Sequence, residues 1–152
     1  PRWSTRSGPS LGRGGTARLV VRMGVWRLAL PPLRRLVRFE RLVELTAAPR
    51  ERPLDAARVQ AVVRVGRRLW RDSAAPCLER SVCIHRELGL AGAQPTLVLG
   101  LAPDHTGHAW VELDGTALLE PSPPTGRYRE LMRFDAAGAL LTVSDAPQPA
   151  GA

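Results

Sequence analysis

A cysteine and a histidine are the residues of this sequence whose types and positions suit covalent catalysis. Cys77 follows Pro76 and begins a segment with helical spacing, and His108 begins a segment that alternates like a strand. Backbone N–H groups and the helix dipole at a helix N-terminus stabilise a thiolate and can hold an oxyanion. An imidazole close to such a thiol acts as its base. The two residues therefore predict a cysteine-dependent, peptidase-type enzyme.

A third side chain is expected to hold the imidazole in the correct tautomer. Two carboxylates downstream of His108 qualify, Glu120 and Asp114. Asp114 and Gly115 are a hairpin turn signal, which predicts that the Asp114 side chain faces solvent. A hairpin centred on this turn pairs residue 120 near residue 109 and so brings Glu120 close to His108. We favour Glu120 and keep Asp114 as the alternative.

The remaining thiol and imidazole groups are interpreted as structural or solvated. Cys83 lies on a different helix face from Cys77 and is expected to be structural. His85 is expected on the helix surface and His105 in a solvated turn. No metal site is predicted, because the Cys-x5-Cys-x-His spacing matches no common structural zinc motif. No other cofactor is predicted, because no phosphate-binding loop is recognisable.

Three side chains close to the cysteine and the histidine are expected to have no chemical role of their own. Ser81 lies one helical turn after Cys77 and is expected to allow close packing of the helix on the sheet. Trp110 shares a strand face with His108 and is expected to pack beside it. Arg80 is expected to be solvated, and contact with a substrate carboxylate is the alternative.

The predicted helices precede an antiparallel meander of strands, which is an α+β arrangement with the helices on one face of the sheet. Residues 1–24 and 144–152 are expected to be disordered, leaving one domain over residues 25–143. Helices are expected over residues 33–45, where Pro31 and Pro32 mark the start, over 55–69, and over 77–88, where Gly89 marks the end. Strands are expected over residues 96–101, 108–113, 116–120, 127–134 and 139–143.

The composition is strongly basic, and every positive side chain is arginine. The 22 arginines and 14 acidic residues give a net charge of +8, which favours acidic peptides or proteins and anionic membrane surfaces as partners. The arginines are spread along the chain and the aromatic residues are few, which argues against a nucleic-acid reader. The Arg-rich helix over residues 33–45 is the candidate for weak contact with a membrane surface.

Neither a signal peptide nor a membrane span is predicted. The best apolar stretch, residues 23–33, is interrupted by Arg27 and contains no small-x-small cleavage site, and no apolar run reaches about 18 residues. Cys77 and Cys83 lie on one predicted helix at a separation too long for a disulfide. Two unpaired thiols indicate a reducing, cytoplasmic setting.

The chain resembles the transglutaminase-like B proteins of lasso-peptide biosynthesis, and most closely their stand-alone peptidase form. The resemblance covers residues 54–143. It is carried by these strings in this order: Cys77-Leu78-Glu79-Arg80-Ser81, Val98-Leu99-Gly100, His108-Ala109-Trp110-Val111-Glu112 and Asp114-Gly115.

The resemblance implies a papain/transglutaminase-like fold with the catalytic cysteine at a helix N-terminus. It implies that Cys77 and His108 are nucleophile and base, and that the protein removes the leader from a ribosomally made lasso-peptide precursor. An asparagine-synthetase-like lasso cyclase would then close the macrolactam. A separate leader-recognition protein is expected as a partner, because no winged-helix leader-binding domain precedes residue 54. The family usually has Asp as its third residue, and Glu120 stands at that place.

Two other functions fit the same residues. An enzyme of the same fold would act as an amidase or transamidase on a different amide. A catalytically silent peptide-binding module would keep the fold and lack the chemistry. A precursor gene and a cyclase gene adjacent to the gene for this protein would favour leader removal over the first alternative. A Cys77 that alkylates faster than a free thiol would favour an enzyme over the second.

Overall fold

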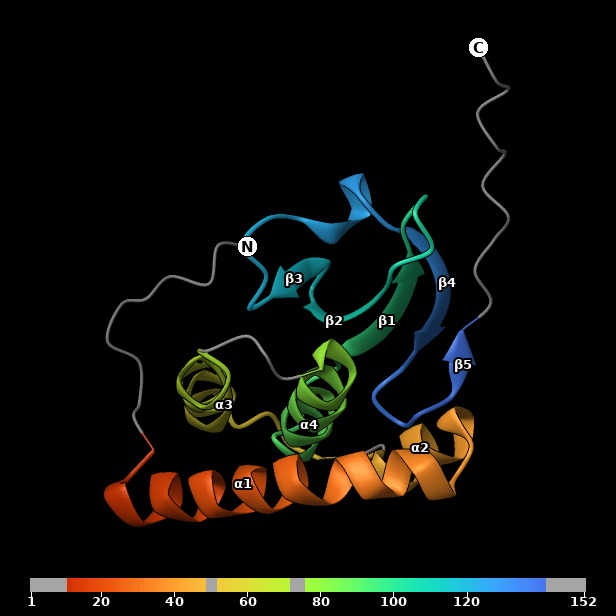
Figure 1. Ribbon diagram of the computed structural model, residues 1–152. Helices are drawn as coiled ribbons and strands as arrows, with labels where there is room; N and C mark the ends of the chain where they lie inside the picture. Colours follow the sequence, from red (N-terminus) through yellow and green to blue (C-terminus); the bar gives the residue numbers. More distant parts are fainter. Residues whose placement is uncertain (1–10, 49–51, 72–75, 142–152) are drawn as a thin grey trace.

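The computed structural model describes residues 11–48, 52–71 and 76–141, and this part of the chain forms four α-helices and a five-stranded antiparallel sheet (Figure 1). The helices are α1 (Arg13–Leu36), α2 (Phe39–Thr46), α3 (Ala56–Leu69) and α4 (Cys77–Leu90). The strands are β1 (Thr96–Leu101), β2 (Gly107–Leu113), β3 (Thr116–Leu118), β4 (Arg129–Phe134) and β5 (Leu140–Leu141). The predicted α+β arrangement is confirmed. Among the helices described, none is both long and apolar enough to cross a membrane.

Helix α1 covers residues that the sequence predicted to be disordered, so that prediction is wrong for residues 13–24. Leu19, Met23 and Leu30 are the buried residues of this helix, and they pack into the hydrophobic core. The apolar face was hidden in the sequence because so few side chains of a Gly- and Arg-rich segment form it. Residues 1–10 and 144–152 lie outside the described part of the chain.

The single helix predicted over residues 33–45 is two helices. Pro31 and Pro32 lie inside α1 and do not start a helix, although each lacks the backbone N–H that an interior helical position normally uses. Helix α1 ends at Leu36, where the extended conformation of Val37 breaks the pattern. Helix α2 then begins at Phe39.

Helix α3 agrees with its prediction. The carboxylate of Asp55 accepts a hydrogen bond from the backbone N–H of Arg58 at 2.9 Å, which caps the helix N-terminus. The buried side of α3 includes Val59, Val62 and Val65.

Helix α4 is central, because it contacts α1, α2 and α3 as well as β1 and β2 (Figure 1). It extends beyond the predicted end, and Gly89 lies inside it. A Cβ at Gly89 would stand 2.7 Å from the Cβ of Ala48, so close packing explains the glycine. The left-handed residue that follows the helix is Gly92, with a φ of 76°.

Two buried carboxylates of α4 pair with arginines of the other helices. Glu87 forms salt bridges with Arg22 of α1 and, at 3.6 Å, with Arg58 of α3. Glu79 lies 3.5 Å from Arg34, near the end of α1. A buried charge left without its partner is strongly destabilising. The Glu87 pairs therefore fix α1 and α3 to α4, and the longer Glu79–Arg34 contact, which is not a hydrogen bond, adds a weaker link near the other end of α4.

The strand order in the sheet is β3-β2-β1-β4-β5. Asp114 and Gly115 have φ values of 51° and 71° and join β2 to β3 in the predicted hairpin. The predicted simple meander is wrong, because β4 pairs with β1 and not with β3. Prolines at 121, 123 and 124 interrupt pairing after β3, since proline cannot donate to a ladder. The last predicted strand is described only up to residue 141.

Candidate active site

Cys77 is the first residue of α4 and directly follows Pro76, the N-cap residue. Its thiol is free and its side chain is partly exposed. The first N–H groups of an α-helix have no partner within the helix, and the positive end of the helix dipole lies there. Cys77 thus occupies the kind of position in which a protein stabilises a thiolate.

The second turn of α4 is held against the start of β2. The Ser81 hydroxyl, one helical turn after Cys77, donates a hydrogen bond to the carbonyl oxygen of Ala109 at 2.9 Å. Strand β3 pairs with β2 only as far as Val111, so the start of β2 lies beyond that ladder. The contact places the N-terminal turns of α4 beside the residue that follows His108. The predicted close packing at Ser81 is confirmed.

His108 has a carboxylate partner. Its Nε2 lies 3.1 Å from Oε2 of Glu120, and the two side chains are 18% and 8% exposed. With Nε2 directed at the carboxylate, Nδ1 is the ring nitrogen left for the thiol. Among the hydrogen bonds of the described residues, none joins Cys77 to His108. In free enzymes such catalytic contacts are often long and tighten when substrate binds.

Glu120 reaches His108 from outside the sheet. Strand β3 ends at Leu118 and does not extend to residue 120 as predicted. Leu119, between them, has a φ of 61°, a left-handed conformation that redirects the chain after the strand. The Glu120 carboxylate also forms a salt bridge with Arg80 of α4. Arg80 is only 16% exposed, so the prediction that it is solvated is wrong.

Asp114 lies in the turn after β2, at the end of the strand away from His108. Its side chain is exposed, as the sequence predicted. The structure therefore brings Glu120, and not Asp114, to the imidazole.

Aromatic rings surround the His108 imidazole. Trp110 stacks at 6.0 Å and Tyr128 at 4.8 Å between ring centroids, which confirms the predicted packing of Trp110. Gly100 is opposite His108 on β1, and a Cβ there would lie 2.9 Å from both the Trp110 ring and the Cβ of Tyr128. Tyr128, the single tyrosine of the chain, was missed in the sequence because it precedes β4 outside any motif.

The other thiol and imidazoles lie apart from this arrangement. Cys83 is buried, and burial raises its pKa to about 12. His85 is buried too, so its predicted surface position is wrong: the helix face that carries it packs inside the protein. His105 is exposed in the turn between β1 and β2. Within the described residues, no group of three or more His, Cys, Asp or Glu side chains is arranged to hold a metal ion.

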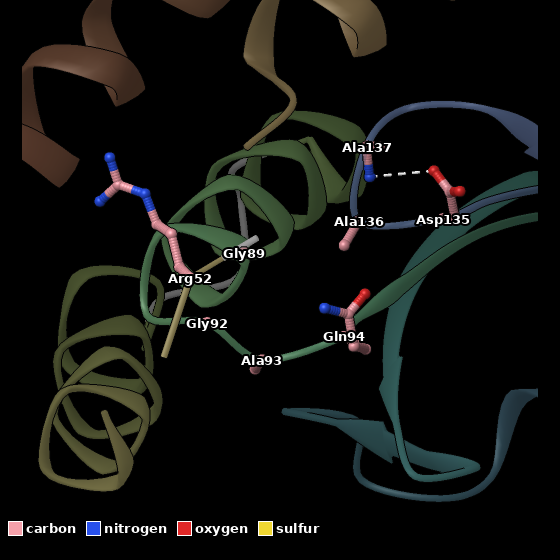
Figure 2. Close-up of a pocket in the computed structure, with 8 residues that line it drawn as sticks. All are labelled: Arg52, Gly89, Gly92, Ala93, Gln94, Asp135, Ala136 and Ala137. Carbon is pink, nitrogen blue, oxygen red and sulfur yellow. Dashed lines mark hydrogen bonds between the residues drawn. The ribbon is translucent and has the colours of Figure 1, made fainter. Parts of the chain in front are cut away.

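A pocket of about 230 Å³ lies at the other end of α4 from Cys77. Figure 2 shows Gly89 and Gly92 on one side of it and the turn from Asp135 to Ala137 on the other. The Asp135 carboxylate is occupied in that turn, where it accepts a hydrogen bond from the N–H of Ala137 at 2.9 Å (Figure 2). The pocket is therefore separate from the candidate active site.

The chain belongs to the transglutaminase-like superfamily, whose family model matches residues 18–133. That range contains Cys77, His108 and Glu120. The superfamily generally includes cysteine proteases with Cys–His–Asp triads. Comparisons with curated proteins and with solved structures give no significant match.

Proposed function

We propose that the protein is a cysteine peptidase that removes the leader from a ribosomally synthesised lasso-peptide precursor before the macrolactam is closed. The observation that carries the chemistry is the 3.1 Å contact between His108 Nε2 and Glu120 Oε2, beside the helix that begins with Cys77. The choice of substrate rests on the resemblance of the strings around Cys77 and His108 to the lasso-peptide B proteins.

In the proposed reaction, the Cys77 thiolate attacks the carbonyl carbon at the leader–core junction, and backbone N–H groups at the start of α4 hold the oxyanion. His108 then protonates the departing amine of the core peptide. A water molecule, deprotonated by His108, hydrolyses the thioester, which releases the leader carboxylate and regenerates the thiol. Glu120 holds Nε2–H throughout and stabilises the imidazolium.

The precursor is proposed to arrive bound to a separate leader-recognition protein, and the freed core peptide to pass to the asparagine-synthetase-like cyclase. The outer face of α1 supports a partner of this kind. Val21, Leu28 and Leu36 are 67%, 78% and 79% exposed there, on a helix that carries several arginines and no acidic residue. This surface suits a partner with apolar and acidic side chains. Weak contact with an anionic membrane surface would use the Arg-rich segment over residues 33–45.

A transamidase or amidase on another amide is the second candidate, because the acyl-enzyme step is common to both reactions. In a transamidase an amine takes the place of water as the acceptor of the acyl group. The two candidates differ in the released product, so the same experiment separates them.

The test mixes the purified protein with a precursor peptide and the leader-recognition protein and follows the products by mass spectrometry. We expect free leader ending in a carboxylate, no release by Cys77→Ala, and nearly unchanged release by Cys83→Ala. Equal loss in both variants, each shown to be folded by circular dichroism, would refute the assignment. A leader product joined to an added amine would support the transamidase.

The same assay distinguishes the two carboxylates. Glu120→Ala should lower kcat by about 10²- to 10⁴-fold, because the imidazole loses the group that orients it. Asp114→Ala should leave kcat within about twofold of wild type, since surface substitutions away from a site change little. The reverse ranking would transfer the role to Asp114.

A further inference from the structure

The Glu120 carboxylate has two partners, one on each oxygen. His108 Nε2 is at Oε2, and Arg80 of α4 forms its salt bridge with Oε1. We propose that Arg80 is a positioning residue: it fixes the Glu120 carboxylate so that the free oxygen is directed at His108. This inference rests on the proposed catalytic roles of Cys77, His108 and Glu120.

The location of Glu120 explains why it needs such an anchor. It lies after the end of β3, where no ladder hydrogen bond of that strand fixes its backbone. A glutamate also has one more rotatable bond than the aspartate usual in triads, and so more ways to miss the imidazole. A guanidinium is planar and permanently charged, and it matches carboxylate geometry better than an ammonium.

Arg80 is well placed to act on the site through Glu120. It lies in the first turn of α4, between Cys77 and Ser81, on the segment that Ser81 ties to Ala109. The Arg80 and Glu120 side chains are 16% and 8% exposed, so the pair is largely shielded from water. An ion pair in such a position interacts more strongly than one at the exposed surface. One helix therefore supplies both the thiol and the group that positions the carboxylate.

The charges around the imidazole make the proposal testable by pH. From α4 the relevant groups are Cys77 and Arg80, and from the segment after β3 it is Glu120. Tyr128 stacks on the ring from the segment before β4, and the Arg127 guanidinium lies 5.4 Å from the centre of the Tyr128 ring. Without Arg80 the Glu120 carboxylate is no longer held at His108, so the imidazolium that stabilises a thiolate loses part of its support, as it does when the Glu120 charge itself is removed.

The first measurement needs no substrate, so it separates this inference from the proposed function. The rate of Cys77 alkylation by iodoacetamide is followed against pH in a Cys83→Ala background. In both Arg80→Gln and Glu120→Gln the profile should move to higher pH, whereas a pure charge effect would move the Glu120→Gln profile to lower pH. In Arg80→Lys, which keeps the charge, the profile should stay close to that of the parent protein. An unmoved profile in folded Arg80→Gln would overturn the proposal.

Arg86→Gln is the matched control. Arg86 lies on the same helix and pairs with Glu87 at 2.8 Å, at the end of α4 away from Cys77. This variant should lower the thermal midpoint of unfolding and leave the alkylation profile in place. If Arg86→Gln moves the profile as far as Arg80→Gln does, the effect is one of helix stability and the proposal fails.

The second measurement uses leader release. Arg80→Gln should lower kcat by roughly tenfold to a hundredfold, by analogy with the loss seen when a group that orients a metal ligand is removed, with KM nearly unchanged. Arg80→Lys should recover part of kcat. A rise in KM with kcat unchanged would mean that Arg80 binds substrate, which contradicts the proposal.

A double-mutant cycle decides whether Arg80 acts through Glu120. In a Glu120→Gln background, Arg80→Gln should reduce kcat much less than it does in the wild-type background. Two independent, multiplicative losses would overturn the proposal. If no variant or wild-type protein releases leader while the alkylation profiles shift as expected, the proposed substrate is wrong and the inference about Arg80 stands.

Discussion

The two cysteines of α4 show how position decides the chemistry of a side chain. Cys77 is partly exposed at the first residue of the helix. Cys83 is buried against the core, where desolvation and the charge of Glu87 raise its pKa to about 12. A thiol that stays protonated is a poor nucleophile. Only Cys77 of the two is therefore placed to react near neutral pH.

His85 is a buried titratable group outside the candidate active site. Burial lowers its pKa from 6.5 to about 4, and the backbone of Asp135 and of Pro95 offsets this only in part. Neither ring nitrogen has a hydrogen bond of normal geometry. The folded protein therefore holds His85 neutral, while the unfolded chain takes up a proton near pH 6.5.

Folding stability should consequently fall as pH drops from 6.5 to about 4. The difference between these two values corresponds to about 3 kcal/mol of unfolding free energy. Urea unfolding at pH 7.5 and pH 4.5 measures the loss in the wild type and in His85→Leu. His85→Leu removes this imidazole and leaves every other ionisable side chain in place, so the difference between the two losses reports on His85. Equal losses in the two proteins would contradict this account.

At the scale of elements, the strand of His108 and the helix of Cys77 were predictable from the sequence because their patterns are local. Strand alternation, the Asp114-Gly115 turn and the Asp55 cap each act within a few residues. The predictions that were wrong concern segments whose structure depends on contacts with residues far away in the sequence. Helix α1 is stabilised because Leu19, Met23 and Leu30 pack into the core. The local sequence pattern of this segment does not indicate that packing.

The carboxylate of the site was predictable only in part. Hairpin geometry indicated that Glu120 would approach His108. It did not reveal that β3 would end at Leu118, or that Arg80 would hold the carboxylate. Both features arise from tertiary contacts between α4 and the segment after β3. Tyr128 was missed for the same reason, because it contacts the imidazole only through the tertiary structure.

Strand β1 contributes to the site through the absence of a side chain. Gly100→Ala should displace the rings of Trp110 and Tyr128, because the added Cβ would lie 2.9 Å from atoms of both residues. Overpacking of this kind costs about 1–3 kcal/mol, and kcat should fall as the stacking on His108 is lost. Thermal unfolding and leader release check the two effects. Ala102→Gly, a change of the same size just beyond β1, is the control, and a matching loss of kcat there would argue against a specific role for Gly100.

At the scale of the whole molecule, the protein is layered, with α4 between the sheet and α1 (Figure 1). Buried Glu87 and Glu79 join α1 to α4, and Ser81 and Arg80 join α4 to β2 and to Glu120. The packing of α1 against α4 thus helps to fix the position of Cys77, the first residue of α4. The Cys77 thiol therefore belongs to the helix layer formed by α4, and the His108 imidazole belongs to the sheet.

The most direct test of the central claim is the rate at which iodoacetamide modifies Cys77 at pH 7, with and without His108. We expect Cys77 in the wild type to react faster than free cysteine and to slow by about tenfold or more in His108→Ala, because the base is lost. Cys83 should remain unmodified in both proteins. A Cys77 that reacts no faster than a free thiol, and equally fast without His108, would contradict the proposed thiolate–imidazole pair.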